Sequence, residues 1–149
     1  MLYRFAVNEL KAGALQRRYG YSVVVMQYYP RFVKKELVDE YLRTLAPDKE
    51  LFTEFKALDR KFGDHDLAFE KVRYEERFSL SAAGVDDLKR LSALSLTQDV
   101  YLFCQCRATE RCHADLLLLA ARLWFRAPIQ WIRVKYPRYE ARLETERPA

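Results

Sequence analysis

Asp99-Val-Tyr-Leu-Phe-Cys-Gln-Cys106 is an apolar stretch that leads, from about Cys112, into a second apolar segment ending near Phe125. A short, nearly continuous apolar run is typical of a strand buried on both faces, as in a parallel sheet. The segment from Cys112 to Phe125 is apolar almost all round, so we expect a largely buried helix. A buried strand that turns directly into a buried helix predicts an α/β fold.

The rest of the chain alternates in the same way. We expect further strands over residues 2–7, 21–26 and 129–134, and helices over residues 37–45, 48–62, 64–72 and 85–94. This order predicts one α/β domain over residues 1–137, with a mostly parallel sheet flanked by helices. The strands at 21–26, 99–105 and 129–134 are expected to be parallel neighbours. Residues 138–149 are charged, and we expect a peripheral tail.

Composition limits the class of protein. Half of the 149 residues are apolar and 32% are charged, which is typical of a globular domain. The net charge of +5 favours anionic partners, either a small anionic ligand or nucleic acid. The sequence has no apolar run long enough for a signal peptide or a membrane span, and three cysteines suit a reducing compartment. We therefore expect a cytoplasmic protein without membrane association, of undetermined oligomeric state.

The turn between the strand ending at Cys104 and the next helix concentrates reactive side chains. All three cysteines and His113 fall within ten residues there. A strand-to-helix turn offers backbone N–H groups and the positive end of a helix dipole, which favour an anion or a thiolate. We take His113 as a candidate acid or base, and Cys112, beside Arg111, as a candidate reactive thiol. His65 is expected to be a surface residue.

A second loop follows a predicted parallel strand and supplies candidate ligand-binding residues. In open α/β sheets the ligand crevice lies at the carboxyl ends of the strands. The loop after residues 21–26 should therefore share that edge with the loop around His113. We expect Arg31 and His113 to line one pocket that prefers an anion. The candidate ligand-binding residues are Tyr28, Tyr29, Arg31, Arg107 and Arg111.

Two familiar readings of the cysteines fit the spacing poorly. Cys104, Cys106, Cys112 and His113 are suitable metal ligands, but their spacing matches no common zinc knuckle, so we expect no metal and no cofactor. A phosphatase loop needs arginine six residues after its cysteine. Here Glu110 follows Cys104 and Cys112 follows Cys106 at that distance, which excludes this reading.

Several motifs together resemble the Domain of Unknown Function 488 family. They are Tyr-Tyr-Pro-Arg-Phe-Val-Lys-Lys (28–35), Val38-Asp-Glu-Tyr41, Leu45-Ala-Pro-Asp-Lys-Glu-Leu-Phe52, and a strand ending in Cys104 with Cys112-His113 eight residues on. The Leu-Ala-Pro insert and Ala114 are more similar to the YeaO-like branch. The resemblance implies a small α/β domain without an established biochemical role. Many members carry arginine where this chain has Ala114, so no role of that arginine transfers. The YeaO-like branch can keep the histidine without the cysteines, which favours His113 over the thiols.

Three functions remain open from the sequence. The first is an enzyme acting on a small anionic or nucleotide-like molecule, with His113 as acid or base. The second is a nucleic-acid-binding module that uses tyrosines as stacking platforms. Its basic residues would be Arg31, Lys34, Lys35, Arg107 and Arg111. The third is a redox-responsive thiol protein. We favour the enzyme because the reactive groups converge on one turn instead of following a stripe.

Overall fold

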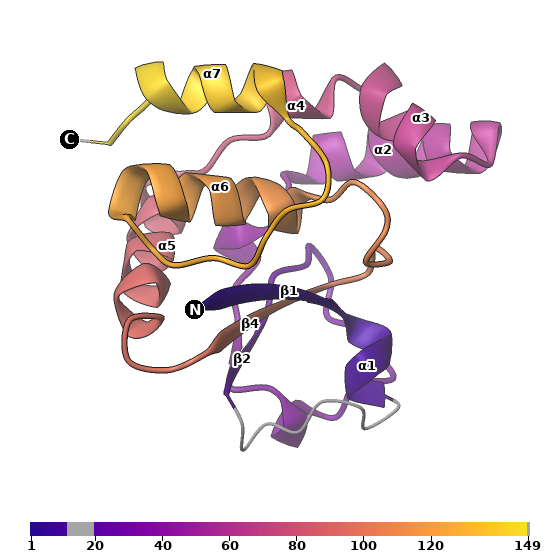
Figure 1. Ribbon diagram of the computed structural model, residues 1–149. Coiled ribbons are helices and arrows are strands. Elements are labelled where there is room, and N and C mark those ends of the chain that lie inside the picture. The colour runs from indigo at the N-terminus through magenta and orange to yellow at the C-terminus, as the bar shows by residue number, and fades with distance from the viewer. Residues whose placement is uncertain (12–19, 149) are drawn as a thin grey trace.

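The strand that follows Asp99 lies inside a parallel sheet. In the computed structural model, which describes residues 1–11 and 20–148, the sheet has the order β1-β4-β2-β3 (Figure 1). Its strands are β1 (Leu2–Ala6), β2 (Tyr21–Val24), β3 (Glu40–Tyr41) and β4 (Val100–Cys104). β4 pairs in parallel with β1 on one side and with β2 on the other. The predicted α/β class with a parallel sheet is confirmed.

Strand geometry distributes the core over both faces of the sheet, because successive side chains point in opposite directions. Val100 and Leu102 join the core with α5 (Ala82–Leu94) and α6 (His113–Phe125). Tyr101 and Phe103 pack on the opposite face, where α1 (Val7–Lys11) lies. Residues 113–121 of α6 are all buried, as their apolar character predicts. Cys104 therefore shares a face of the sheet with α6.

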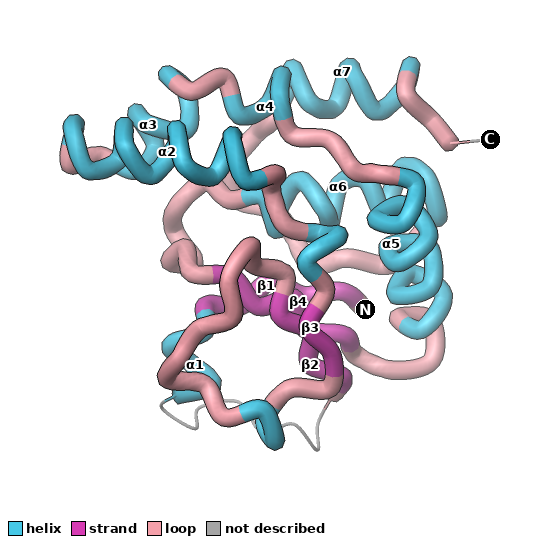
Figure 2. Tube along the Cα trace, turned by 180° about the vertical axis from the view of Figure 1, so that it is seen from behind, coloured by secondary structure: helices cyan, strands magenta, loops and turns pink. Residues whose placement is uncertain are grey.

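Further helices lie beyond α6, away from the sheet (Figures 1 and 2). They are α2 (Lys49–Phe62), α3 (His65–Lys71), α4 (Tyr74–Arg77) and α7 (Pro137–Thr145). Asp48 and Asp64 cap α2 and α3 by accepting a hydrogen bond from the backbone three residues on. None of the helices in the described part of the chain is long and apolar enough to cross a membrane.

The expected helix over residues 37–45 is wrong. The segment contains two 3-10 turns, η2 (Lys35–Leu37) and η3 (Arg43–Leu45), with β3 between them (Figure 2). Asp39 N and Leu42 N donate to backbone carbonyls of β2, so the segment extends the sheet. Its apolar side chains then divide between the two faces: Val38 and Tyr41 pack with the α1 side, and Leu45 packs with the helix side. The apolar spacing that resembles a helix therefore arises because this segment contributes side chains to both faces of the sheet.

The expected strand over residues 129–134 is also wrong. Among these residues only Ile129 forms a parallel bridge, with Leu2. The backbone N–H of Arg4 is then taken by the Gln130 side chain, at 2.6 Å, instead of by a neighbouring backbone carbonyl. The segment 129–134 thus lies along the outer edge of β1. We had expected it beside the strands at 21–26 and 99–105, and that expectation is wrong.

The segment expected to be a peripheral tail, residues 138–149, packs on the domain over its described residues 138–148. Most of them belong to α7, which packs on α6 and α4 and buries Tyr139 and Leu143. Arg142 Nη1 donates to the backbone carbonyls of Glu75, in the first turn of α4, and Phe78, the residue that follows α4. The charge of this segment reflects the outer face of a packed amphipathic helix.

Candidate functional site

A pocket of about 600 Å³ lies at the carboxyl ends of β1, β2 and β4. Each of the three strands supplies the segment that follows it, namely 7–8, 26–32 and 105–107. Helix α2 closes the opposite side with Phe52, Phe55 and Lys56. The crevice at the strand ends is thus lined by segments far apart in the sequence, as the parallel sheet predicts.

Most of the candidate residues meet at this pocket. Arg31 and His113 both line it, as we expected from their positions after parallel strands. Tyr28, Tyr29 and Arg107 line it too. The hydroxyl of Tyr29 is buried and has no hydrogen-bond partner in the described part of the chain. The roles of these residues in binding or catalysis stay predictions.

Arg111 does not line this pocket. Its guanidinium donates to the Lys135 carbonyl at 2.7 Å and lies over the ring of Tyr136. Its backbone N–H donates to Asp66 Oδ1. The side chain therefore holds the loop against the segment before α7.

His113 begins α6 and has one ring nitrogen already engaged. Nε2 lies 2.6 Å from the Val25 carbonyl oxygen, which can only accept, so Nε2 carries the hydrogen. Nδ1 then holds the lone pair in the neutral ring and lies 3.7 Å from Cys112 Sγ. Burial lowers the pKa of His113 below its ordinary value. The imidazole is thus a neutral, oriented group at the inner end of the pocket.

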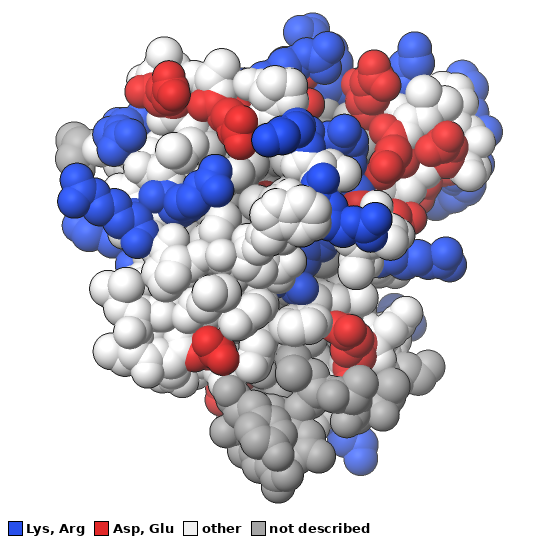
Figure 3. All heavy atoms as spheres, in the orientation of Figure 1, with Lys and Arg blue, Asp and Glu red and all other residues white. Residues whose placement is uncertain are grey.

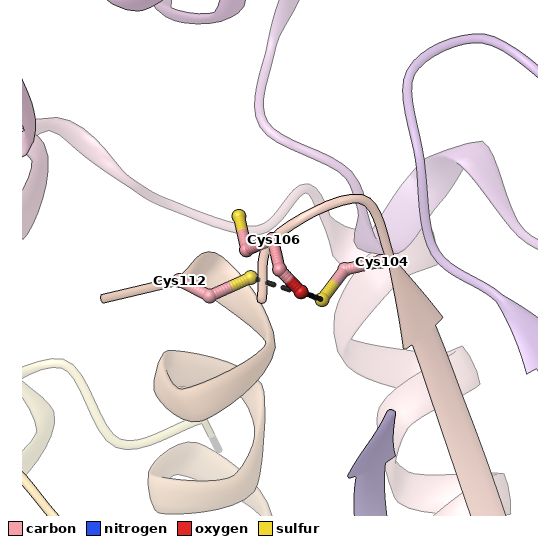
Figure 4. A group of neighbouring side chains, drawn as sticks. All are labelled: Cys104, Cys106 and Cys112. Carbon is pink, nitrogen blue, oxygen red and sulfur yellow. Dashed lines mark hydrogen bonds between the residues drawn. The ribbon is translucent and has the colours of Figure 1, made fainter. Parts of the chain in front are cut away.

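The three cysteines form one cluster (Figure 4). Cys104 ends β4, Cys106 lies in the next loop, and Cys112 is the N-cap of α6. Their sulfur atoms all lie within 4.8 Å of one another. Cys104 and Cys112 are fully buried, with 3.2 Å between their sulfurs, whereas Cys106 lines the pocket.

The expected low pKa of Cys112 is not what the environment favours. Burial, together with the neighbouring Cys104 and Cys106, raises the pKa of the Cys112 thiol. The pKa of Cys104 is instead lowered, because Cys106 and Cys112 stabilise its thiolate by hydrogen bonding.

The start of α6 is not an open anion site, contrary to our expectation. The N–H of Cys112 donates to the Tyr136 hydroxyl at 3.2 Å, and the N–H of Ala114 donates to Cys112 Sγ at 3.4 Å. The Tyr136 hydroxyl in turn donates to Asp115 Oδ2 at 2.6 Å. An anion in the pocket would therefore rely on side-chain cations.

A buried arginine holds the loop between β4 and α6. Arg4 Nη1 donates to Asp115 Oδ2 at 2.8 Å. Its Nη2 donates to the backbone carbonyls of Arg107 and Glu110 at 2.5 and 2.6 Å. Burial lowers the pKa of Arg4, but the nearby Cys112, Cys104 and Asp115 raise it by more. The net pKa is above the ordinary value, so the guanidinium stays charged. The sequence gives no local sign of these contacts, which join segments about a hundred residues apart.

A family model described as "Active DUF488-N3 subclade" matches residues 7–123 of the 149. The chain belongs to the DUF488 family. The match includes the pocket-lining loops, the three cysteines and His113, and it does not establish the YeaO-like branch. Comparisons with curated proteins and with solved structures found no match.

This DUF488 protein has a second imidazole at its pocket, which we had placed at the surface. His65 lines the pocket and packs edge-on against Phe55, with ring centroids 5.0 Å apart. Its Nε2 lies 2.8 Å from the Arg111 carbonyl, and Nδ1 lies 3.6 Å from Glu110 Oε2. The flanking aspartates suggested an exposed helix start, whereas the ring turns inward between α2 and the 105–111 loop of this DUF488 domain.

Proposed function

We propose that the protein is an enzyme acting on a small molecule that carries an aromatic ring and an anionic group, such as a nucleotide. The observation that carries this proposal is the composition of the strand-end pocket. Cationic Arg31, Lys56 and Arg107 line it together with aromatic rings and His113. The word "Active" in the description of the matched subclade also favours catalysis.

The aromatic side chains offer a place for a planar ring. Tyr28 and Phe52 meet edge to face with centroids 5.6 Å apart, and Tyr28 is 52% exposed. Lys56 Nζ lies 5.8 Å from the centre of the Phe52 ring, so a cation accompanies the aromatic surface. A stacked base with a phosphate near Arg31 or Lys56 would satisfy both kinds of contact.

His113 is the candidate proton carrier for this reaction. Its hydrogen bond to Val25 fixes the ring in the neutral form that a general base requires, with the lone pair on Nδ1, 3.7 Å from Cys112 Sγ. Asp59 and Glu110 also line the pocket and supply acidic groups near its rim. We propose His113 as base and Arg31 as ligand-positioning cation.

Binding is tested by thermal shift and calorimetry with nucleoside monophosphates, the matching nucleosides and inorganic phosphate. The nucleotide is expected to stabilise the protein more than either part alone. R31A should weaken binding about tenfold, as expected for a lost charged hydrogen bond. R133A removes an arginine that is also exposed but lies outside this pocket, and it should leave affinity unchanged. Equal affinities of R31A and R133A, or no nucleotide binding at all, would contradict the proposal.

Catalysis is tested with H113Q, in which the glutamine amide can still donate to the Val25 carbonyl. We expect nucleotide binding to persist and turnover, followed by chromatography of the products, to fall by at least about 100-fold. H65Q is the matched control, since glutamine can keep the contact with the Arg111 carbonyl. Turnover by H113Q at the wild-type rate would exclude His113 as the base.

A second candidate is a nucleic-acid-binding surface, favoured by the exposed loop from Tyr28 to Lys35. Arg31, Lys34 and Lys35 are exposed there, beside exposed Tyr28 and Phe32. On the face drawn in Figure 3, however, basic and acidic side chains are mixed over α2, α3 and α7. The basic side chains there do not form the continuous positive track that would follow a nucleic-acid backbone. The basic pair Arg17-Arg18 lies outside the described residues. Binding of single-stranded oligonucleotides that weakens steeply with salt would favour this candidate.

A further inference from the structure

The three sulfur atoms have the arrangement of a partial coordination shell. In a tetrahedral site with metal–sulfur bonds of about 2.3 Å, neighbouring sulfurs lie about 3.8 Å apart. Here two sulfurs are 3.2 Å apart and no pair exceeds 4.8 Å. All three thiols are free, so none is tied up in a disulfide. Small side-chain movements would let Cys104, Cys106 and Cys112 share one ion.

We propose that Cys104, Cys106 and Cys112 bind one thiophilic divalent metal ion, with Zn²⁺ the best match, through three thiolates. Three sulfur ligands select zinc over the hard cations Mg²⁺ and Ca²⁺. Spacing alone argued against a metal, because zinc knuckles bring their cysteines together with short turns. In this fold a strand end and a helix N-terminus bring the sulfurs together instead (Figure 4).

The surroundings of the sulfurs suit a charged metal–thiolate group. The N–H of Ala114 donates to Cys112 Sγ, a contact that stabilises sulfur as it gains negative charge. Three thiolates and one divalent ion carry a net charge of −1, and the buried guanidinium of Arg4, although paired with Asp115, is a nearby positive charge that offsets part of it. The three protons released by the thiols leave to solvent.

Access to the cluster comes from the pocket side. Cys104 and Cys112 are closed off from solvent, while Cys106 is half-buried and lines the pocket. An ion can therefore enter past Cys106, and a water molecule on that side can supply the fourth donor of a tetrahedral ion. Binding would fix the loop that carries Arg107 and Glu110 to both β4 and α6. This proposal stands independently of the nucleotide proposed above.

The test is a Co²⁺ titration of the reduced, metal-stripped protein. We expect thiolate-to-cobalt charge-transfer absorption that saturates at one equivalent and disappears when Zn²⁺ is added. In parallel, a thiol reagent should modify Cys106, which lines the pocket, in the stripped protein, and should react at least about tenfold more slowly with the Zn²⁺-loaded protein. Both readouts use the unaltered chain, so they do not depend on whether a variant folds.

Serine variants then assign the ligands. C106S removes the half-buried sulfur and should weaken Co²⁺ binding about 100-fold while keeping the wild-type circular dichroism spectrum. C104S and C112S should do the same. H65Q, at the same pocket but bonded to a backbone carbonyl and not to sulfur, should bind Co²⁺ like the wild type.

Three results would overturn the proposal. One is Co²⁺ binding without charge-transfer absorption, which would place the ion on oxygen or nitrogen ligands. Another is thiol reactivity that Zn²⁺ leaves unchanged. The third is rapid formation of a Cys104–Cys112 disulfide under a mild added oxidant, which takes up the two electrons, at the same rate with and without stoichiometric Zn²⁺; this would favour the redox-responsive thiol instead.

Discussion

Arg4 and Asp115 form an ion pair at 2.8 Å between the first strand and the first turn of α6, with side chains only 5% and 6% exposed. The same guanidinium holds two carbonyls of the loop that lines the pocket. Because its hydrogen bonds reach both the helix and the loop, Arg4 fixes the distance between the sheet and the site.

D115N should be strongly destabilising. The change leaves the buried Arg4 cation without its counter-charge, and breaking a buried pair on one side costs about 3–5 kcal/mol. Urea unfolding measures the difference. E140Q is the matched control, because Glu140 makes a single long contact of 4.0 Å with Arg122 at the surface. It should change stability by less than about 0.5 kcal/mol. A D115N protein as stable as E140Q would show that the buried pair is dispensable.

Y136F should cost about 1–3 kcal/mol. The hydroxyl accepts from the Cys112 N–H and donates to Asp115, so its loss leaves two buried groups without this partner. Y139F is the control, since Tyr139 is also a buried tyrosine and its hydroxyl takes part in none of the hydrogen bonds found among the described residues. Thermal unfolding of the two variants gives the comparison. Similar melting temperatures would mean that the Tyr136 hydroxyl adds nothing to the start of α6.

Glu40 predicts a pH dependence at the β3 edge. Hydrogen bonds from Arg90, and then from Tyr21, lower the pKa of this carboxyl below its ordinary value of 4.5. Its folded pKa is thus lower than its unfolded pKa. The contribution to stability is therefore complete above about pH 4.5 and is lost as the pH falls through the folded pKa.

E40Q should lower the unfolding free energy by up to about 1 kcal/mol near pH 7, a value kept small because Arg90 is half exposed. The difference from wild type should shrink as the pH approaches about 3. Urea unfolding across this range measures it, with E144Q, at an exposed carboxylate, as the charge-matched control. A difference that grows toward acid pH would mean that the sign is wrong.

Gly84 marks a close approach between α5 and the η3 turn. A Cβ added there would lie 2.5 Å from the Thr44 backbone carbonyl oxygen, so the backbone would have to move. We expect G84A to destabilise the protein by about 1–3 kcal/mol, although alanine favours helices. A83S on the exposed side of the same helix should change the unfolding midpoint little. A stabilised G84A protein would show that η3 shifts freely.

The sequence predicted the elements whose signals are local. The apolar run before Cys104 and the continuous apolar helix after Cys112 are both confirmed. The segment 37–45 misled because its apolar residues have helical spacing but serve two faces of one sheet. The spacing of apolar residues indicates which side chains are buried, but it does not indicate which element they pack against.

The site was predicted only in part, for the same physical reason. Arg31 and His113 follow parallel strands, so topology alone brings them to one edge. Arg4 lies 111 residues from Asp115 in sequence, and no local pattern indicates that a charged residue on a strand points into the core. The cysteine spacing likewise could not show that Cys104, at a strand end, and Cys112, at a helix start, lie close enough for their sulfur atoms to be in contact.

The covering of β1 bears on the protein's behaviour at high concentration. An exposed strand edge is a template on which a second chain can pair and aggregate. Pro128 and Gln130 hydrogen-bond to the outer backbone groups of Leu2, and the Gln130 side chain accepts from the Arg4 N–H; the other edge of the sheet is the two-residue β3. The irregular segment that stands where we expected a last strand therefore protects the sheet from pairing with a second chain. It hydrogen-bonds to the edge of β1 but is not itself an extended strand with a free edge.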